Sequence, residues 1–118
     1  MDKSIKTHKD LKLWKSSIDL VREVYKLTYG FPKEELYGLT SQLRRASISV
    51  PSNIAEGAGR ESQKDFVRFL NFSKGSLSEL ETQLIIAEEL NYTENIKPLL
   101  NKIIEIRILL IGLIKSLK

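Results

Sequence analysis

Residues that could carry out catalysis are sparse in this chain of 118 residues. Acid–base and nucleophilic enzymes need a base beside a nucleophile. The chain has no cysteine, and its one histidine, His8, lies near the N-terminus, where we expect it to be exposed and solvated. Glu79 and Glu81 are two positions apart, so on a helix they point to different sides and suit no shared metal, and residues 57–59 lack the Lys-Ser/Thr of a phosphate-binding loop. We therefore expect a protein that is not an enzyme and that needs no metal or cofactor.

An arginine pair, Arg44 and Arg45, is the first of two candidate binding groups. Neighbouring residues on a helix point about 100° apart, so the two side chains cannot grip one phosphate side by side. Each arginine could instead reach a different nucleic-acid strand or a different subunit. The alternative is structural, with Arg44 or Arg45 paired to acids such as Glu79 or Glu81 within or between subunits.

The second candidate is a basic stripe of Arg60, Lys64 and Arg68, which recur every four residues and so share one helix face. Such a stripe suits the electrostatic binding of phosphates. The charge of the whole chain is uneven too: residues 1–60 hold eleven Lys/Arg against seven Asp/Glu, whereas residues 61–118 hold eight of each. The net charge of +4 therefore resides in the first half, and the sequence predicts RNA or DNA as a partner.

The composition indicates one soluble domain. With 42% hydrophobic and 29% charged residues, the chain can build a core and need not be disordered. The absence of cysteine suits a cytoplasmic protein. The most apolar segment, residues 103–114, is too short and too charged to span a bilayer, so we expect no membrane partner. We expect a flexible basic arm at residues 1–9 and a single domain at residues 10–118.

Four helices account for that domain. The first is predicted over residues 10–28, beginning at the N-cap Asp10, and the second over residues 37–60, with Pro51 inside it. The third follows a capping residue, Ser62, and the last ends near the C-terminus of the chain. Because the connections between them are short, the sequence predicts an all-α, antiparallel up-down-up-down four-helix bundle.

Each helix has a seam of residues at spacings of three and four, which predicts the side that faces the core. The first seam is Leu11, Trp14, Ile18, Val21, Tyr25 and Thr28; the second is Leu39, Leu43, Ala46, Val50, Asn53 and Gly57; the third is Phe66, Phe69, Ser73, Leu77, Leu80, Leu84 and Ala87. We expect Asn53 to fix the helix register through a buried hydrogen bond. Gly75 costs about 1 kcal/mol against alanine in mid-helix, so we expect a packing reason for it.

The last helix is apolar on two sides. One seam is Leu99, Ile103, Ile106, Leu110, Leu113 and Leu117, and a second stripe is Leu100, Ile104, Ile108 and Ile111. A four-helix bundle needs one apolar stripe per helix, and a second stripe left in water would expose more apolar surface than soluble monomers usually tolerate. We therefore predict a homo-oligomer whose interface includes that second stripe, together with Ile48 from the outer side of the second helix.

Several stretches of the chain together resemble a known family. The main ones are residues 24–28 (VYKLT), 37–46 (YGLTSQLRRA), 50–57 (VPSNIAEG) and 75–84 (GSLSELETQL). This combination, spread over nearly the whole chain, resembles the small four-helix-bundle proteins first noticed as reading frames in intervening sequences of bacterial 23S ribosomal RNA genes. Ser73 stands where similar proteins often have alanine.

The resemblance implies a four-helix bundle assembled into a homopentameric ring, which agrees with the doubly apolar last helix. A related branch resembles the accessory protein of diversity-generating retroelements, a basic pentamer that associates with a reverse transcriptase and its RNA. The family offers no catalytic residues to carry over to this chain.

Two functions therefore stay open. The first is a non-enzymatic, ring-forming accessory protein that binds RNA or DNA through the basic stripe and the arginine pair. The second is a protein-docking scaffold that presents repeated surfaces to a reverse transcriptase or another nucleic-acid enzyme. A scaffold of that kind would have little nucleic-acid affinity of its own.

Overall fold

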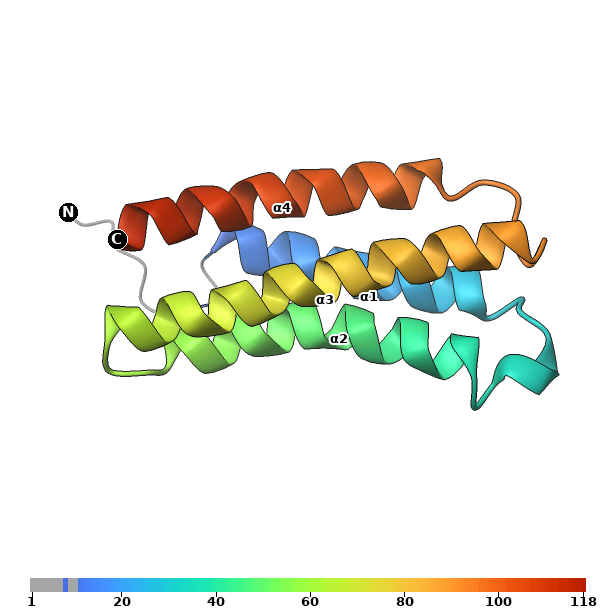
Figure 1. Cartoon of the computed structure of the whole chain (residues 1–118), viewed down its shortest axis with the longest axis horizontal. Coiled ribbons are helices and arrows are strands. Elements are labelled where there is room, and N and C mark those ends of the chain that lie inside the picture. The colour runs from blue at the N-terminus through green and yellow to red at the C-terminus, as the bar shows by residue number, and fades with distance from the viewer. Residues whose placement is uncertain (1–7, 9–10) are drawn as a thin grey trace.

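The computed structural model describes residue 8 and residues 11–118. In chain order its helices are α1 (Lys12–Thr28), the short 3₁₀ helix η2 (Lys33–Glu35), α2 (Leu39–Ala58), α3 (Gln63–Glu89) and α4 (Lys97–Leu117). The four long helices run side by side, each antiparallel to the next in sequence (Figure 1). The described residues contain no strand, and the predicted all-α bundle is confirmed. Of the predicted arm at residues 1–9, only His8 belongs to the described part of the chain.

In cross-section the four long helices lie at the corners of a square. α1 packs against α2 and α4, and α3 packs against the same two helices. α2 and α4 therefore lie on one diagonal of the square, and α1 and α3 lie on the other. Each helix turns one side to its two neighbours and leaves another side facing outwards.

The start of α2 is set by a side chain that precedes the helix. Glu35 in η2 accepts a hydrogen bond from the backbone N–H of Leu39 through Oε1, at 2.9 Å, and so satisfies one of the free donors at the helix N-terminus. Gly38 makes this contact possible, because a Cβ there would lie 2.6 Å from the same oxygen. The predicted start at residue 37 was therefore two residues early.

The other helices begin close to their predicted positions. The hydroxyl of Ser62 accepts a hydrogen bond from the backbone N–H of Asp65 at 3.1 Å, which confirms the cap of α3. A proline, Pro98, occupies the first turn of α4, where its missing donor costs nothing. α1 begins after Leu11, which occupies the N-cap position; the predicted cap, Asp10, lies outside the described residues.

The core is aliphatic and draws on all four long helices. Its largest fully buried side chains are Leu20, Val24, Leu43, Val50, Ile54, Leu70, Leu77, Leu80, Leu84, Ile103, Ile106 and Leu110. On α1 the predicted seam was correct only in part. Thr28 is buried as predicted, but Trp14 and Ile18 are half-buried and Tyr25 is exposed. Leu13 and Val24, which lie outside that seam, are buried instead. Two sides of this helix carry apolar residues at helical spacing, and periodicity alone does not say which side meets the other helices.

Small residues allow α2 and α3 to approach closely. A Cβ on Gly57 would lie 2.8 Å from the Cβ of Phe69 and 2.9 Å from Cδ1 of Phe66, so the contact needs glycine. Further along the pair, the buried hydroxyl of Ser73 donates a hydrogen bond to the backbone carbonyl of Val50 at 2.8 Å. This bond joins the two helices at one fixed register.

Two predictions about this helix pair were wrong. Asn53 is half-buried and donates a hydrogen bond to the carbonyl of Ser49 in its own helix, at 2.9 Å, so it does not fix the register between helices. Ile54, the next residue, faces the core instead. Gly75 is exposed, and a Cβ there would meet no atom within 4 Å outside its own helical turn, so packing within the chain does not explain this glycine.

The inner side of α4 completes the core much as predicted. Its buried residues are Leu99, Ile103, Ile106, Leu110 and Ile114, and Leu113 and Leu117 are half-buried against the core. Ion pairs tie the helix to both neighbours: Arg107 meets Glu81 of α3 at 2.9 Å, and Lys102 meets Asp19 of α1 at 3.8 Å. These contacts fix which side of α4 faces inwards.

The outer side of α4 stays exposed in the single chain. Ile104, Ile108 and Ile111 are 49%, 65% and 41% exposed, as expected for a second stripe with no partner inside the bundle. Leu100, predicted with them, is half-buried and packs against the core. Ile48 of α2 is exposed on a different side of the bundle.

Candidate nucleic-acid interface

A groove with two arginines opens between α1 and the N-terminal half of α2. It has a volume of about 530 Å³ and is lined by Tyr25, Leu36, Tyr37, Ser41, Arg44, Arg45, Ile48, Ser49, Ser52 and Asn53. We call it the arginine groove. Its lining contains two cations, two tyrosines and several hydroxyl and amide groups, and it contains no Asp or Glu. An anion that enters the groove therefore meets positive charge with no carboxylate in the wall.

Arg44 is held in place by contacts with α1. Its Nε donates a hydrogen bond to the hydroxyl of Thr28 at 2.9 Å, and that buried hydroxyl donates in turn to the carbonyl of Val24 at 2.8 Å. The guanidinium also lies over the ring of Tyr25, 4.4 Å from its centroid, a cation–π contact. The orientation of the Arg44 head group is thus fixed before any ligand binds.

The alternative in which Arg44 or Arg45 pairs with Glu79 or Glu81 is not seen within the chain. The partners of Arg44 are Thr28 and Tyr25, and Glu81 pairs with Arg107 of α4. The reason is positional: Arg44 is turned to α1, and Glu81 is turned to α4.

Arg45 has the opposite character to Arg44. Its side chain is exposed, and it makes no ion pair with another described residue. Tyr37, which also lines the groove, is 93% exposed, so its ring is open to a stacking partner. The groove therefore combines a fixed guanidinium, a free guanidinium and an accessible aromatic ring.

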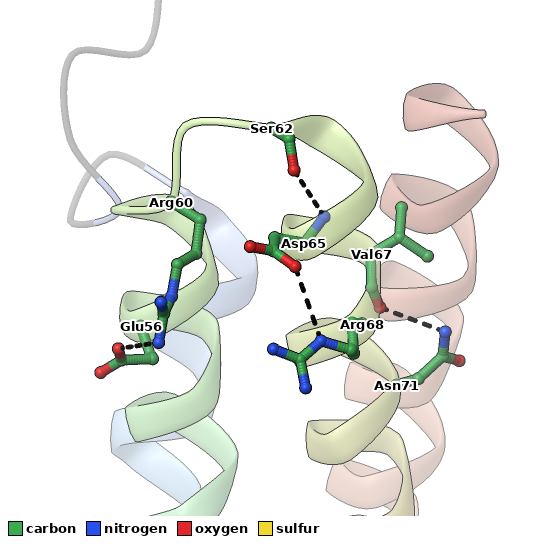
Figure 2. A network of polar contacts seen from close by, with 7 residues as sticks. All are labelled: Glu56, Arg60, Ser62, Asp65, Val67, Arg68 and Asn71. Carbon is green, nitrogen blue, oxygen red and sulfur yellow. Dashed lines mark hydrogen bonds and ion pairs between the residues drawn. The ribbon is translucent and has the colours of Figure 1, made fainter.

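The basic stripe lies at the turn between α2 and α3. The prediction that its three residues share one helix face was wrong, because Arg60 lies in the turn before α3. Figure 2 shows that its arginines face carboxylates. Arg60 reaches back along α2 to Glu56 at 2.7 Å, and Arg68 lies 3.6 Å from Asp65 within α3. Over residues 56–68 the three cations are matched by three acids, Glu56, Glu61 and Asp65. The segment that contains the stripe, residues 56–68, therefore has no net charge.

Aromatic rings underlie the stripe. The guanidinium groups of Arg60 and Arg68 lie 4.7 Å and 5.0 Å from the centroid of Phe69. Phe72 packs edge-on against Phe69 at 5.4 Å and is exposed. The structure thus brings Arg60 and Arg68 to one ring, while Lys64 is exposed and makes no ion pair with another described residue.

One acid, Glu35, is close in sequence to the arginine groove, but its carboxylate is hydrogen-bonded to residues outside the groove. Glu35 precedes the groove residue Leu36, but its carboxylate accepts hydrogen bonds from Leu39 N–H at 2.9 Å and from the hydroxyl of Tyr92 at 2.8 Å. The Leu39 bond, followed by the Tyr92 bond, lowers the pKa of Glu35 below its usual 4.5. The hydrogen bond between Tyr92 and Glu35 raises the pKa of Tyr92. Both groups keep their charge states at neutral pH.

Sequence reasoning identified both arginines of the groove but missed the residues that complete it. Tyr25 and Thr28 were assigned to a core seam, yet they position Arg44. Tyr37 was recognised only as part of a family motif. One signal could have linked these residues to the arginines. The motif at residues 24–28, which contains Tyr25 and Thr28, and the motif at residues 37–46, which contains the arginine pair, both contribute to the resemblance.

The described residues offer neither a metal site nor a membrane-spanning helix. Among residues 8 and 11–118, no group of three or more His, Asp or Glu side chains could hold a metal ion. Within the same residues, no helix has the length and apolar character needed to cross a membrane.

Comparison with known proteins places the chain in a family. No curated protein matches it. Residues 9–112, which are most of the chain, match the 23S rRNA-intervening sequence protein. The helical bundle agrees with the resemblance seen in the sequence motifs, and the protein belongs to the 23S rRNA-intervening sequence protein family.

Proposed function

We propose that this protein is a non-enzymatic accessory protein that binds RNA or DNA and acts as a homo-oligomeric ring, with five copies as its family resemblance implies. The observation that carries the nucleic-acid part is the arginine groove, where Arg44, Arg45 and two tyrosines line one depression without a carboxylate. The family name, which refers to ribosomal RNA genes, supports the same proposal.

The chemistry of the groove favours single-stranded nucleic acid. Arg44 offers a fixed contact for one phosphate, and Arg45 offers a movable contact for a neighbouring one. The open ring of Tyr37 gives an unpaired base a surface for stacking, which contributes roughly 1–3 kcal/mol per base and tolerates any sequence. Bases in a duplex are already stacked and paired, so they gain less from such a ring.

Matched variants of the two basic surfaces test this assignment. Binding of a labelled single-stranded RNA is followed by fluorescence anisotropy at several salt concentrations, for wild type, Arg45→Ala and Arg68→Ala. Loss of one phosphate contact reduces the slope of log affinity against log salt by about 0.7 for single strands. We expect that reduction for Arg45→Ala. We expect little change for Arg68→Ala, because Asp65 already faces this guanidinium at 3.6 Å.

Two results would contradict the proposal. Absence of salt-dependent RNA or DNA binding by the wild type removes the nucleic-acid role. Equal effects of the two variants would show that the groove is not the main binding site. Arg60, Lys64 and Arg68 would then be as good a candidate for the site as Arg44 and Arg45. Tyr37→Ala adds a separate check, because it should weaken binding about tenfold through lost stacking without changing the salt slope.

The ring is supported by the exposed isoleucines of α4, whose apolar surface has no partner within the chain. Light scattering on the purified protein gives the mass in solution, and a mass of several chains is expected. A single-copy species would remove the ring and leave the groove proposal to stand on the RNA measurements.

A docking scaffold for a reverse transcriptase or another nucleic-acid enzyme is the second candidate. The same exposed aliphatic surface favours it, since apolar patches mark protein–protein contacts as readily as self-association. The two functions differ in one measurement. A scaffold retains its partner in a pull-down after nuclease treatment and shows little RNA affinity by itself, whereas the groove proposal predicts RNA binding by the protein alone.

A further inference from the structure

The exposed isoleucines of α4 form one continuous strip, which we call the outer stripe: Ile104, Ile108 and Ile111. Their spacing of four and three places them on one face of the helix. The helix cannot turn this face inwards, because Ile103, Ile106 and Leu110 already fill the core. The ion pairs to α1 and α3 hold the same orientation. The outer stripe is therefore a fixed apolar ridge on one corner of the bundle.

A second apolar feature lies on the side of the bundle formed by α1 and α2. This groove, the Trp14 groove, has a volume of about 280 Å³ and is lined mainly by Trp14, Ile18 and Val21 of α1 with Ile48, Pro51 and Ala55 of α2. No Lys, Arg, Asp or Glu belongs to its lining. The ring of His8 lies at its end, 5.1 Å from the Trp14 ring.

The outer stripe of the same molecule cannot reach this groove. The groove lies between α1 and α2, and α4 is diagonal to α2 in the bundle. A helix packed into the groove must therefore come from another molecule. Each chain therefore has an apolar groove and an apolar ridge, and the two lie on different sides of the bundle.

The two features lie at the same level along the bundle axis. α1 and α4 are antiparallel (Figure 1), and Lys102 of α4 pairs with Asp19 of α1. Counting from this pair, Ile104 lies level with about residue 17 and Ile108 with about residue 13, since both helices rise equally per residue. Ile18 and Trp14 each lie within one residue of these two levels, whereas Val21 lies beyond them. A parallel copy beside the first would bring Ile104 and Ile108 close to the level of Ile18 and Trp14, so ridge and groove overlap along the axis.

Charges beside the two features are complementary. Glu105 flanks the outer stripe and Lys15 flanks Trp14, and both are exposed. Neither makes an ion pair with another described residue. The same counting places Glu105 level with about residue 16, next to the position of Lys15. A second copy of this chain therefore matches the groove in polarity and charge.

We infer that copies of this chain join head to tail, with the outer stripe of one copy seated in the Trp14 groove of the next. The inference rests on the proposed self-assembly and names its two surfaces. Because these surfaces differ, every copy in a pair keeps one free stripe or one free groove. Such heterologous contacts continue until rotation closes a ring. The arginine groove shares Ile48 and Ser52 with the Trp14 groove, so each interface would adjoin an arginine groove.

Complementation between two variants tests the inference. Ile108→Asp places a charge on the most exposed stripe residue and leaves the groove intact, whereas Ala55→Glu blocks the groove and leaves the stripe intact. Light scattering should show each variant alone as a single copy. A mixture of equal amounts should form a species of two copies, because one intact stripe can meet one intact groove and no further contact is available.

Controls keep the experiment decisive. Ser52→Glu, at an exposed groove position, replaces Ala55→Glu if the latter lowers helicity by circular dichroism. Ile86→Asp alters an isoleucine that is 42% exposed on α3, and this variant should stay assembled. Trp14 is the only tryptophan, so its emission reports the groove directly: it should shift to the red in Ile108→Asp and stay unchanged in Ile86→Asp.

Each outcome has a distinct meaning. A single-copy wild type overturns both the inference and the proposed ring. An assembled Ile108→Asp variant overturns the inference and leaves the ring to other surfaces. If Ile108→Asp dissociates while both groove variants stay assembled, stripe pairs with stripe and the head-to-tail arrangement is wrong. RNA binding through Arg45 is measured separately and survives any of these results.

Discussion

The arginine groove and the basic stripe carry similar numbers of cations, yet they present opposite environments to an anion. In the groove, Arg44 and Arg45 share a wall with tyrosines and hydroxyl groups, and no carboxylate lines it. In the stripe, Arg60 and Arg68 lie against Glu56 and Asp65. Sequence spacing made both groups candidates, and we propose the groove because no carboxylate lines it.

For the binding of an anion, the residues that surround a cation in space matter more than the spacing of the cations in the sequence. An exposed ion pair contributes little to stability, but it lowers the local potential that an approaching phosphate meets. Arg44 is anchored through an uncharged hydroxyl and an aromatic ring, so its full positive charge stays available. Five variants, one of them a matched control, test this contrast and are taken from the largest expected effect to the smallest.

Gly57→Ala should disturb the stripe by moving the ring beneath it. The new Cβ would lie 2.8 Å from the Cβ of Phe69 and 3.2 Å from the carbonyl oxygen of Phe66, so α3 must shift. Overpacking of this kind costs about 1–3 kcal/mol, offset in part by the better helix propensity of alanine. Urea denaturation gives the free energy of unfolding.

Gly75→Ala is the matched control for this substitution. The position is exposed and a Cβ meets no atom within 4 Å outside its own turn, so the change should raise the free energy of unfolding by about 1 kcal/mol. Equal stabilisation in both variants would show that α2 and α3 are not in tight contact at Gly57.

Thr28→Val should loosen the groove by removing the anchor of Arg44. The substitution keeps the side-chain shape but deletes the hydroxyl that accepts from Nε at 2.9 Å. Loss of such a hydrogen bond lowers the free energy of unfolding by about 1 kcal/mol. RNA affinity should fall with it, because Arg44 loses its fixed orientation. Unchanged affinity with reduced stability would mean that preorganisation of Arg44 does not contribute to binding.

Removing acids should convert the stripe into a binding surface. In Glu56→Gln combined with Glu61→Gln, the net charge of residues 56–68 rises from zero to +2, while the Ser62–Asp65 cap is left intact. RNA affinity should rise a few-fold, with a salt slope steeper by no more than about 0.7 per added phosphate contact. If affinity does not change, charge balance is not what distinguishes the stripe from the groove.

Glu35→Gln should have the smallest effect, and one that depends on pH. The pKa of Glu35 is lowered in the folded protein, first by the Leu39 N–H and then by the Tyr92 hydroxyl. Its contribution to stability is therefore present above pH 4.5 and is lost as pH falls through the folded pKa. The variant should have a lower urea midpoint at pH 7. The gap to wild type should narrow in acid, and a constant gap at all pH values would exclude ionisation as its cause.

Much of the fold followed from the sequence. The seam on α4 was predicted almost residue by residue, because its inner positions are aliphatic and their spacing is regular. The cap at Ser62 was recognised because its backbone chemistry is local. The core face of α1 was not predicted correctly, because Trp14 and Ile18 match a helical seam as well as Leu13 and Leu20 do.

The candidate site was predictable only in part. Arg44 and Arg45 were identified by residue type, but their partners come from another helix, and nothing local to the pair indicates Thr28 or Tyr25. The neutrality of the stripe could have been found by counting acids between residues 56 and 68. Asn53 was assigned to the core seam because it fits the spacing, whereas its neighbour Ile54 is the residue that faces inwards.

The sequence by itself determined four helices, their ends to within about two residues, and an apolar surplus on the last helix. These features depend on periodicity and on backbone chemistry, both of which are local. Only the tertiary structure decided which side of α1 is core, which arginine is anchored, and where the stripe of α4 stands relative to the Trp14 groove. Those questions depend on how helices distant in sequence are rotated and aligned against one another, and packing of the whole bundle sets that rotation.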